Sequence, residues 1–180
     1  MRRLLAVSIL SICSVWSLAE SGWWLDVPFV KQPREGCGAA TIAMVIEYWR
    51  QQEGKPEDRT ADVNYIQQAL YSKDAHGIRA SELRDYLEQQ GFETHVFSGD
   101  AGLLAHHVAR GRPLIAALKP ASRAPLHYVV IAGIESGQHI VLVNDPAQRK
   151  LLKVSLGSFE SQWRATGHWT VLAVPRSDRR

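Results

Sequence analysis

Apolar residues recur at helical spacing through the first half of the chain. From Cys37 onward they stand one or two turns apart, and the pattern ends in the charged, glycine-containing stretch 50–59. The sequence therefore predicts a helix that begins at Cys37. Three more helices are predicted at 61–71, at 81–90 with Ser81 as its N-cap, and at 101–110.

Short apolar or β-branched runs dominate the second half. They predict strands at 113–118, 127–134, 139–144 and 169–174, and an earlier edge strand is expected at 25–30. Helices followed by strands indicate an α+β fold. No repeat or low-complexity linker divides the chain, so one domain is expected over residues 20–180.

The first residues have the pattern of an export signal. Met1-Arg2-Arg3 is positively charged, Leu4 to Leu18 is uncharged and mostly apolar, and Ser17-Leu18-Ala19 is a small-x-small cleavage pattern. Residues 1–19 are therefore predicted to be a signal peptide, and the mature protein is predicted to be exported, in the periplasm or secreted. A membrane anchor is the competing interpretation, but residues 4–19 fall short of the roughly 20 needed to span a bilayer.

Removal of the signal changes the charge and the cysteine content. The net charge falls from +3 (21 basic, 18 acidic) to +1 (19 basic, 18 acidic), so composition gives no reason to expect nucleic-acid binding. Cys13 would leave with the signal; its lipidation is not expected, because the large Ile12 precedes it. Cys37 then remains unpaired, either as a reactive thiol or as a small buried hydrophobe.

The sequence around Cys37 favours the reactive thiol. In Gln32-Pro33-Arg34-Glu35-Gly36-Cys37-Gly38 the cysteine stands between two glycines where a loop enters a helix. A helix N-terminus favours thiolate over thiol, and its free N–H groups can hold an oxyanion. The glycines would let a substrate backbone approach, and the upstream Gln32 could add an oxyanion donor.

A base and an orienting acceptor occur later in the chain. His127 begins one predicted strand and Asp145 follows another, so antiparallel pairing of the two would bring them together. Asn144 is an alternative orienting residue, and strand alternation allows only one of Asn144 and Asp145 to face His127.

These segments resemble the papain-like family of bacteriocin-processing, double-glycine cysteine peptidases, and in particular its stand-alone exported members. The resemblance rests on four stretches of the sequence: residues 27–32, 37–49, 127–130 and 143–146. It implies a papain-like fold with catalytic Cys37, His127 and Asp145, an oxyanion role for Gln32, and a peptide or protein substrate. Gln32 stands one position closer to the cysteine than in transporter-fused members, and Gly36 replaces a common acidic residue.

Taken together, these features predict an exported cysteine peptidase that hydrolyses peptide bonds through a thioester. The alternatives are an acyltransferase or amidohydrolase with the same triad, or a non-catalytic peptide-binding domain of this fold. No metal or other cofactor is expected, since the remaining histidines lie in no HExxH or CxxC context. Neither ATP use nor stable membrane insertion after signal cleavage is expected, because the chain has no GxxxxGK[ST] loop and no further hydrophobic span.

Overall fold

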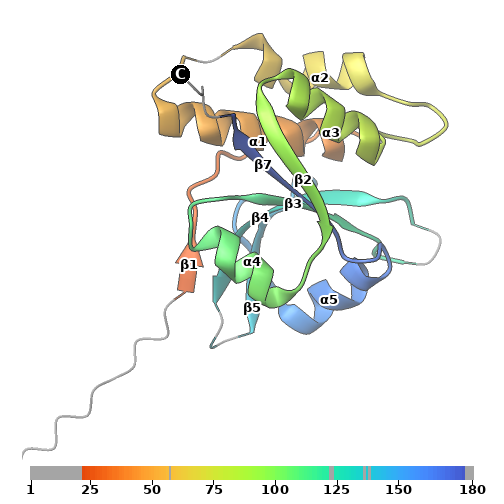
Figure 1. The fold of residues 1–180 in the computed structure, drawn as a ribbon. Coiled ribbons are helices and arrows are strands. Elements are labelled where there is room, and N and C mark those ends of the chain that lie inside the picture. The colour runs from red at the N-terminus through yellow and green to blue at the C-terminus, as the bar shows by residue number, and fades with distance from the viewer. Residues whose placement is uncertain (1–21, 57, 122–123, 136, 138, 177–180) are drawn as a thin grey trace, which may run out of the picture.

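The computed structural model describes residues 22–56, 58–121, 124–135, 137 and 139–176, so the predicted signal peptide 1–19 lies outside the described residues. Helices dominate the first half and strands the second, and the predicted α+β class is confirmed (Figure 1). In chain order the elements are β1 Gly22–Trp24, α1 Cys37–Glu53, the 3₁₀ turn η1 Arg59–Ala61, α2 Val63–Leu70, α3 Ala80–Gln89, β2 Phe92–Ser98, α4 Ala101–Val108, β3 Leu114–Leu118, β4 His127–Glu135, β5 Ile140–Asn144, β6 Leu152–Ser155, α5 Leu156–Arg164 and β7 Trp169–Pro175.

The strands form one antiparallel sheet in the order β2-β7-β3-β4-β5-β6, and β1 pairs with β4. The predicted antiparallel pairing of the runs at 127–134 and 139–144 is confirmed, with Val130 opposite Asn144. Because β4 and β5 are antiparallel neighbours joined by a short connection, the start of β4 and the end of β5 lie side by side at the same end of the sheet.

Each face of the sheet is covered by helices, which explains why the central strands are apolar at consecutive positions. Alternate residues of β3 separate onto two cores: Ile115 and Ala117 pack with α1–α3, whereas Leu114 and Ala116 pack with α4 and α5. Figure 1 shows α1, α2 and α3 on one side of the sheet and α4 and α5 on the other. Helix α1 is thereby held against β4, the strand that carries His127.

Two local predictions are wrong. Residues 25–30 form no strand: after Leu25 donates to the Ala132 carbonyl (2.7 Å), Pro28 has no N–H to continue a ladder. Helix α3 begins at Ala80, and its N-cap is Arg79, two residues before the predicted cap Ser81, because Glu82 Oε2 accepts the backbone N–H of Arg79 (3.2 Å).

Four elements were not predicted: β1, β2, β6 and α5. Strand β2 is an edge strand in which Glu93, His95 and also Val96 are exposed, so its residues do not alternate cleanly between apolar and polar, yet it pairs with β7 over seven residues. The predicted helix at 61–71 divides into η1 and α2, since the Asp62 side chain accepts the Tyr65 N–H (2.7 Å) and starts a new helix.

Candidate active site

Cys37 is the first residue of α1, as its sequence context predicted. Its N-cap, Gly36, makes no side-chain capping hydrogen bond, and the first turn of α1, all of which the structure describes, contains no acidic residue. The partial positive charge of this 17-residue helix is therefore not offset by a side chain at its start. The half-buried Cys37 thiol lies at this positive end of the helix.

The glycines on either side of Cys37 serve the packing of the chain itself. A Cβ added at Gly36 would lie 2.6 Å from the Pro33 ring, and one at Gly38 would lie 2.9 Å from Ile78 Cβ. Both glycines are buried. Contacts within the protein therefore require glycine at both positions.

His127 and Asp145 lie together at the end of the sheet where β4 starts and β5 ends. His127 Nε2 lies 2.8 Å from Asp145 Oδ1, and their side chains are only 20% and 7% exposed. Their contact follows from the register: one step beyond the Val130–Asn144 pair brings Asp145 opposite Val129, which shares a face with His127.

Asn144, the alternative partner, points away from His127. Its side chain is fully buried, donates to the Val27 carbonyl (3.0 Å) and accepts the Leu151 N–H (2.9 Å). Asn144 lies opposite Val130, three residues from His127 and hence on the other face of the strand. The structure thus brings Asp145, and not Asn144, to His127.

Two groups that the sequence analysis did not identify hold Asp145 in place. The Ala147 N–H donates to Oδ1 (3.0 Å) and Gln148 Nε2 donates to Oδ2 (2.5 Å). An Asp-Pro pair after a strand commonly folds its carboxylate back onto the following backbone, and that signal could have pointed to the residues after Pro146. Oδ2 is thus held by Gln148, while Oδ1, held by the Ala147 N–H, also contacts His127.

Charge and burial both act on the pair. Burial by itself lowers the pKa of His127, but hydrogen bonds to Asp145 and Cys37, together with their negative charges, outweigh it and raise the pKa to about 9. Burial by itself would raise the pKa of Asp145. The hydrogen bond to His127 and the charge of His127, with the hydrogen bonds from Ala147 and Gln148, outweigh burial and hold this pKa below its usual range. His127 is therefore linked to both a carboxylate and the Cys37 thiol, and it stays protonated at neutral pH.

Two aromatic rings belong to the core on the side of Cys37. Tyr128 and Trp169 pack edge to face with ring centres 5.8 Å apart, and both Trp169 and Cys37 pack against the buried cluster that contains Tyr128. Burial, followed by the negative charge of Cys37, raises the pKa of Tyr128.

Gln32 connects the two halves of the site through its backbone. Its N–H donates to the Pro146 carbonyl (3.0 Å), which ties the segment before Cys37 to the residue after Asp145. Its side-chain Oε1 is buried and has no hydrogen-bond partner within the described residues. The backbone hydrogen bond therefore holds Gln32 beside the residue that follows Asp145.

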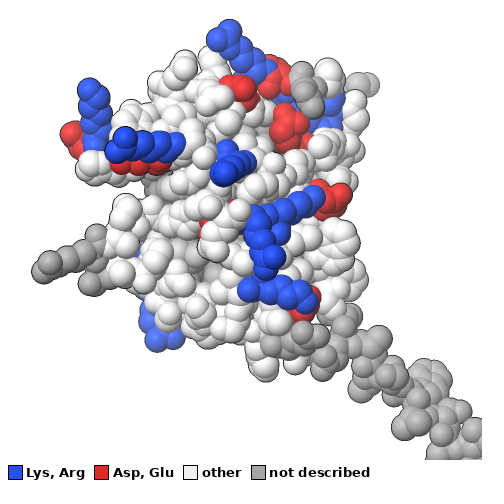
Figure 2. All heavy atoms as spheres, turned by 180° about the vertical axis from the view of Figure 1, so that it is seen from behind, with Lys and Arg blue, Asp and Glu red and all other residues white. Residues whose placement is uncertain are grey.

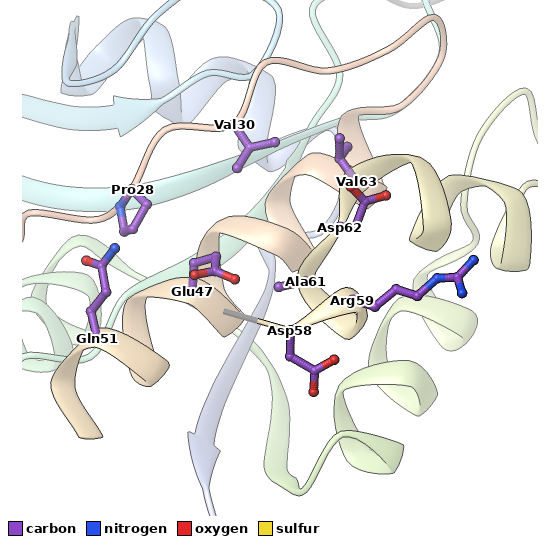
Figure 3. A pocket seen from close by; sticks show the side chains of 9 residues that line it. All are labelled: Pro28, Val30, Glu47, Gln51, Asp58, Arg59, Ala61, Asp62 and Val63. Atoms are coloured by element: carbon purple, nitrogen blue, oxygen red, sulfur yellow. The ribbon is translucent and has the colours of Figure 1, made fainter. Parts of the chain in front are cut away.

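The rest of the described surface offers weaker candidates for chemistry. A hollow of about 740 Å³ lies between α1, η1 and the segment of Pro28 and Val30 (Figure 3), but it holds neither cysteine nor histidine. Asp58 and Asp62 in this hollow already cap η1 and α2. Within the described ranges, no three His, Cys, Asp or Glu side chains gather as a metal site requires.

Two further surface properties bear on partners. On the face seen in Figure 2, basic side chains mostly lie beside acidic ones instead of forming one continuous basic surface. Ion pairs such as Arg50–Asp58 (2.9 Å) and Lys153–Glu135 (3.0 Å) reflect this mixing. Of the helices in the described residues, none has the length and apolar character that crossing a membrane demands.

Comparison with solved structures shows the same fold in peptidase domains. The peptidase domain of Streptococcus ComA, a bi-functional ABC transporter of a quorum-sensing pathway, is 21% identical, with a TM-score of 0.64 over 83% of this chain and 99% of that one. A putative C39-like peptidase from Bacillus anthracis is 20% identical, with a TM-score of 0.66 over 88% and 100%. A double-glycine-motif protease from an AMS/PCAT transporter, solved with its leader peptide, is 18% identical, with a TM-score of 0.64 over 86% and 95%.

No curated protein sequence matches the chain. The sequence profile described as the peptidase C39-like family matches residues 24–171, which include the cysteine, the histidine and the aspartate of the site. This match confirms the family resemblance that the motifs around Cys37, His127 and Asp145 had indicated. The chain belongs to the peptidase C39-like family.

Proposed function

We propose that this protein is an exported cysteine peptidase in which Cys37 is the nucleophile, His127 its base and Asp145 the residue that orients His127. The observation that carries the proposal is the position of His127, which contacts the Asp145 carboxylate at 2.8 Å and lies close enough to Cys37 for that residue to help raise its pKa. Family membership and the papain-like fold support it. A buried histidine linked to both a carboxylate and a thiol is the arrangement that activates a cysteine nucleophile.

Each residue has a definite role in the reaction. The Cys37 thiolate attacks the carbonyl carbon of the scissile bond, and the N–H groups at the start of α1, aided by Gln32, stabilise the oxyanion. The His127 imidazolium gives its proton to the leaving amine, which departs as the thioester forms. His127 then takes a proton from water, which attacks the thioester, releases the acid and regenerates the Cys37 thiolate beside the His127 imidazolium.

The substrate is proposed to be a peptide or protein. The related double-glycine protease was solved with a leader peptide, and the same fold here presents Cys37 at the start of α1, where an extended chain can reach it. The proposal also includes export, which rests on the charged, apolar and small-residue order of residues 1–19. Intact mass of exported protein should show a chain that begins at Glu20, and recovery of Met1 or of a lipidated Cys13 would contradict export by signal cleavage.

A mixture of peptides incubated with purified protein and analysed by mass spectrometry tests the activity. Hydrolysis should stop in Cys37→Ala, because no thioester can form, and nearly stop in His127→Ala, because the leaving amine is not protonated. His168→Ala is the matched control, since this histidine pairs with Glu160 (2.7 Å) away from the triad. Peptide–amine products in place of acids would indicate an acyltransferase, and binding without turnover would refute the enzyme.

A further inference from the structure

The turn that leads into Cys37 contains a strained residue. The Gly36 N–H donates to the Pro33 carbonyl (3.0 Å) and closes the turn, while Glu35 has a φ of 55°. A positive φ at the third residue of a turn is a glycine preference, and a side chain there is disfavoured. Such strain persists where the surroundings hold the residue, and it often occurs beside functional groups. Glu35 therefore requires an explanation beyond the turn itself.

The Glu35 side chain is held by the segment that follows α2. Its Oε2 accepts a hydrogen bond from the Tyr71 hydroxyl, and its Oε1 lies 3.5 Å from His76 Nδ1. The hydrogen bond from Tyr71 is the main cause that lowers the pKa of Glu35, so the carboxylate is ionised and the bond is charge-assisted. The carboxylate thus connects the residue two positions before Cys37 to Tyr71.

Two further contacts join the same segments. Gln67 Nε2 donates to the Arg34 carbonyl (3.4 Å), and Gly38 lies against the buried Ile78 so closely that a Cβ would stand 2.9 Å from Ile78 Cβ. Between them, the turn of residues 72–77 is closed by hydrogen bonds between Ser72 and Gly77 (2.8 and 3.3 Å). The chain on both sides of Cys37 therefore rests on residues 67–78.

We propose that Tyr71 is a positioning residue for Cys37, which acts by holding the Glu35 carboxylate and thereby the strained turn that directs the thiol toward His127. The catalytic consequence rests on the proposed peptidase function. The latch itself, which is the contact between Tyr71 and Glu35, does not depend on it. The contact lines an open hollow of about 730 Å³ on the surface, so it supports the turn from outside the core.

The test measures how fast iodoacetamide alkylates Cys37 in wild type, Tyr71→Phe and Glu35→Gly. Loss of the hydroxyl or of the carboxylate should slow alkylation about three- to tenfold, the factor expected for one hydrogen bond. Tyr65→Phe is the matched control: it lies on α2, is as exposed as Tyr71 (38% and 36%), and its hydroxyl donates no hydrogen bond to the described residues. Tyr65→Phe should react at the wild-type rate.

Glu35→Gly separates positioning from simple turn stability. Glycine relieves the positive φ, so the melting temperature should stay the same or rise while reactivity falls. With a peptide substrate, Tyr71→Phe should lower kcat and leave KM unchanged. Wild-type alkylation in both Tyr71→Phe and Glu35→Gly, or equal slowing in Tyr65→Phe, would overturn the proposal.

A second measurement distinguishes failure of the latch from failure of the proposed function. If the wild-type thiol reacts no faster than free cysteine, the nucleophile assignment fails. Hydrogen exchange of the Gly36 amide, which donates to Pro33, then decides the latch. Faster exchange in Tyr71→Phe than in Tyr65→Phe supports it, and equal exchange removes it.

Discussion

Replacing Asp145 by Asn should shift the titration of His127. The amide keeps the shape of the carboxylate but removes the charge that faces His127 Nε2 at 2.8 Å. The rise of the His127 pKa from 6.5 to about 9 corresponds to ~3 kcal/mol of preference for the imidazolium. Asp145 supplies both a hydrogen bond and a charge to this preference while burial opposes it, so its neutralisation should lower the pKa by about 1 to 2 units.

The assay is a titration of ¹³C-labelled histidines by NMR between about pH 5 and pH 10. Glu160→Gln is the matched control. It removes the carboxylate charge from another histidine–carboxylate pair, His168–Glu160 at 2.7 Å, and should leave the pKa of His127 unchanged. Iodoacetamide alkylation measured in parallel should lose reactivity at mildly acidic pH in Asp145→Asn. A wild-type midpoint at or below 6.5, or one unchanged in Asp145→Asn, would refute the reasoning.

The same shift makes a prediction for stability. Because the folded-state pKa of His127 is raised above its unfolded value, its contribution is fully present below about pH 6.5 and is lost as pH rises through about 9. The free energy of unfolding should therefore fall by at most about 3 kcal/mol over this window in wild type, and by less in Asp145→Asn. Urea unfolding at several pH values measures the difference, and parallel curves for the two proteins would contradict it.

Three other substitutions test separate contacts. Gln32→Ala should lower kcat on the order of 10²-fold if its amide holds the oxyanion, and undiminished turnover would remove it from that role. Asn144→Ala should cost about 2–4 kcal/mol in urea unfolding, because the Val27 carbonyl and the Leu151 N–H lose a buried partner; an unchanged midpoint would show that water replaces the amide. Gly38→Ala should cost about 1–3 kcal/mol, since its Cβ would meet Ile78 at 2.9 Å, and a wild-type melting temperature would disprove this crowding.

Local signals predicted the elements that present the chemistry. The helical spacing after Cys37 placed the thiol at the start of α1, and the two apolar runs placed His127 and Asp145 at strand ends. The edge strand β2 was missed because its apolar residues follow no clean two-residue period: Phe92 is buried, whereas Val96 is 46% exposed. The segment 25–30 was misassigned because its alternation resembles a strand, whereas Asn144 bonds its carbonyls instead.

The groups that hold the candidate site could not be found in the same way. Tyr71 reaches Glu35 across 36 positions in the chain, and Gln148 turns back to Asp145 from a loop without regular periodicity. The Tyr71 side chain carries no local pattern, because its partner is set by how α2 packs, whereas Gln148 lies only three residues from Asp145 and follows the Asp-Pro turn signal. A periodic pattern records which face of an element is buried, and it does not record what that face meets.

The sequence by itself determined the fold class, the position of Cys37 at a helix start and the pair of strands that brings His127 to Asp145. Helix and strand periods, and the pairing of strands adjacent in the chain, are local properties that a sequence carries. Only the tertiary structure decided that Asp145 rather than Asn144 faces His127, that the glycines beside Cys37 are packed against Pro33 and Ile78, and that Glu35 is held by Tyr71. These contacts depend on the exact register of paired strands and on segments far apart in the chain. Both are set by the packing of two cores around one sheet.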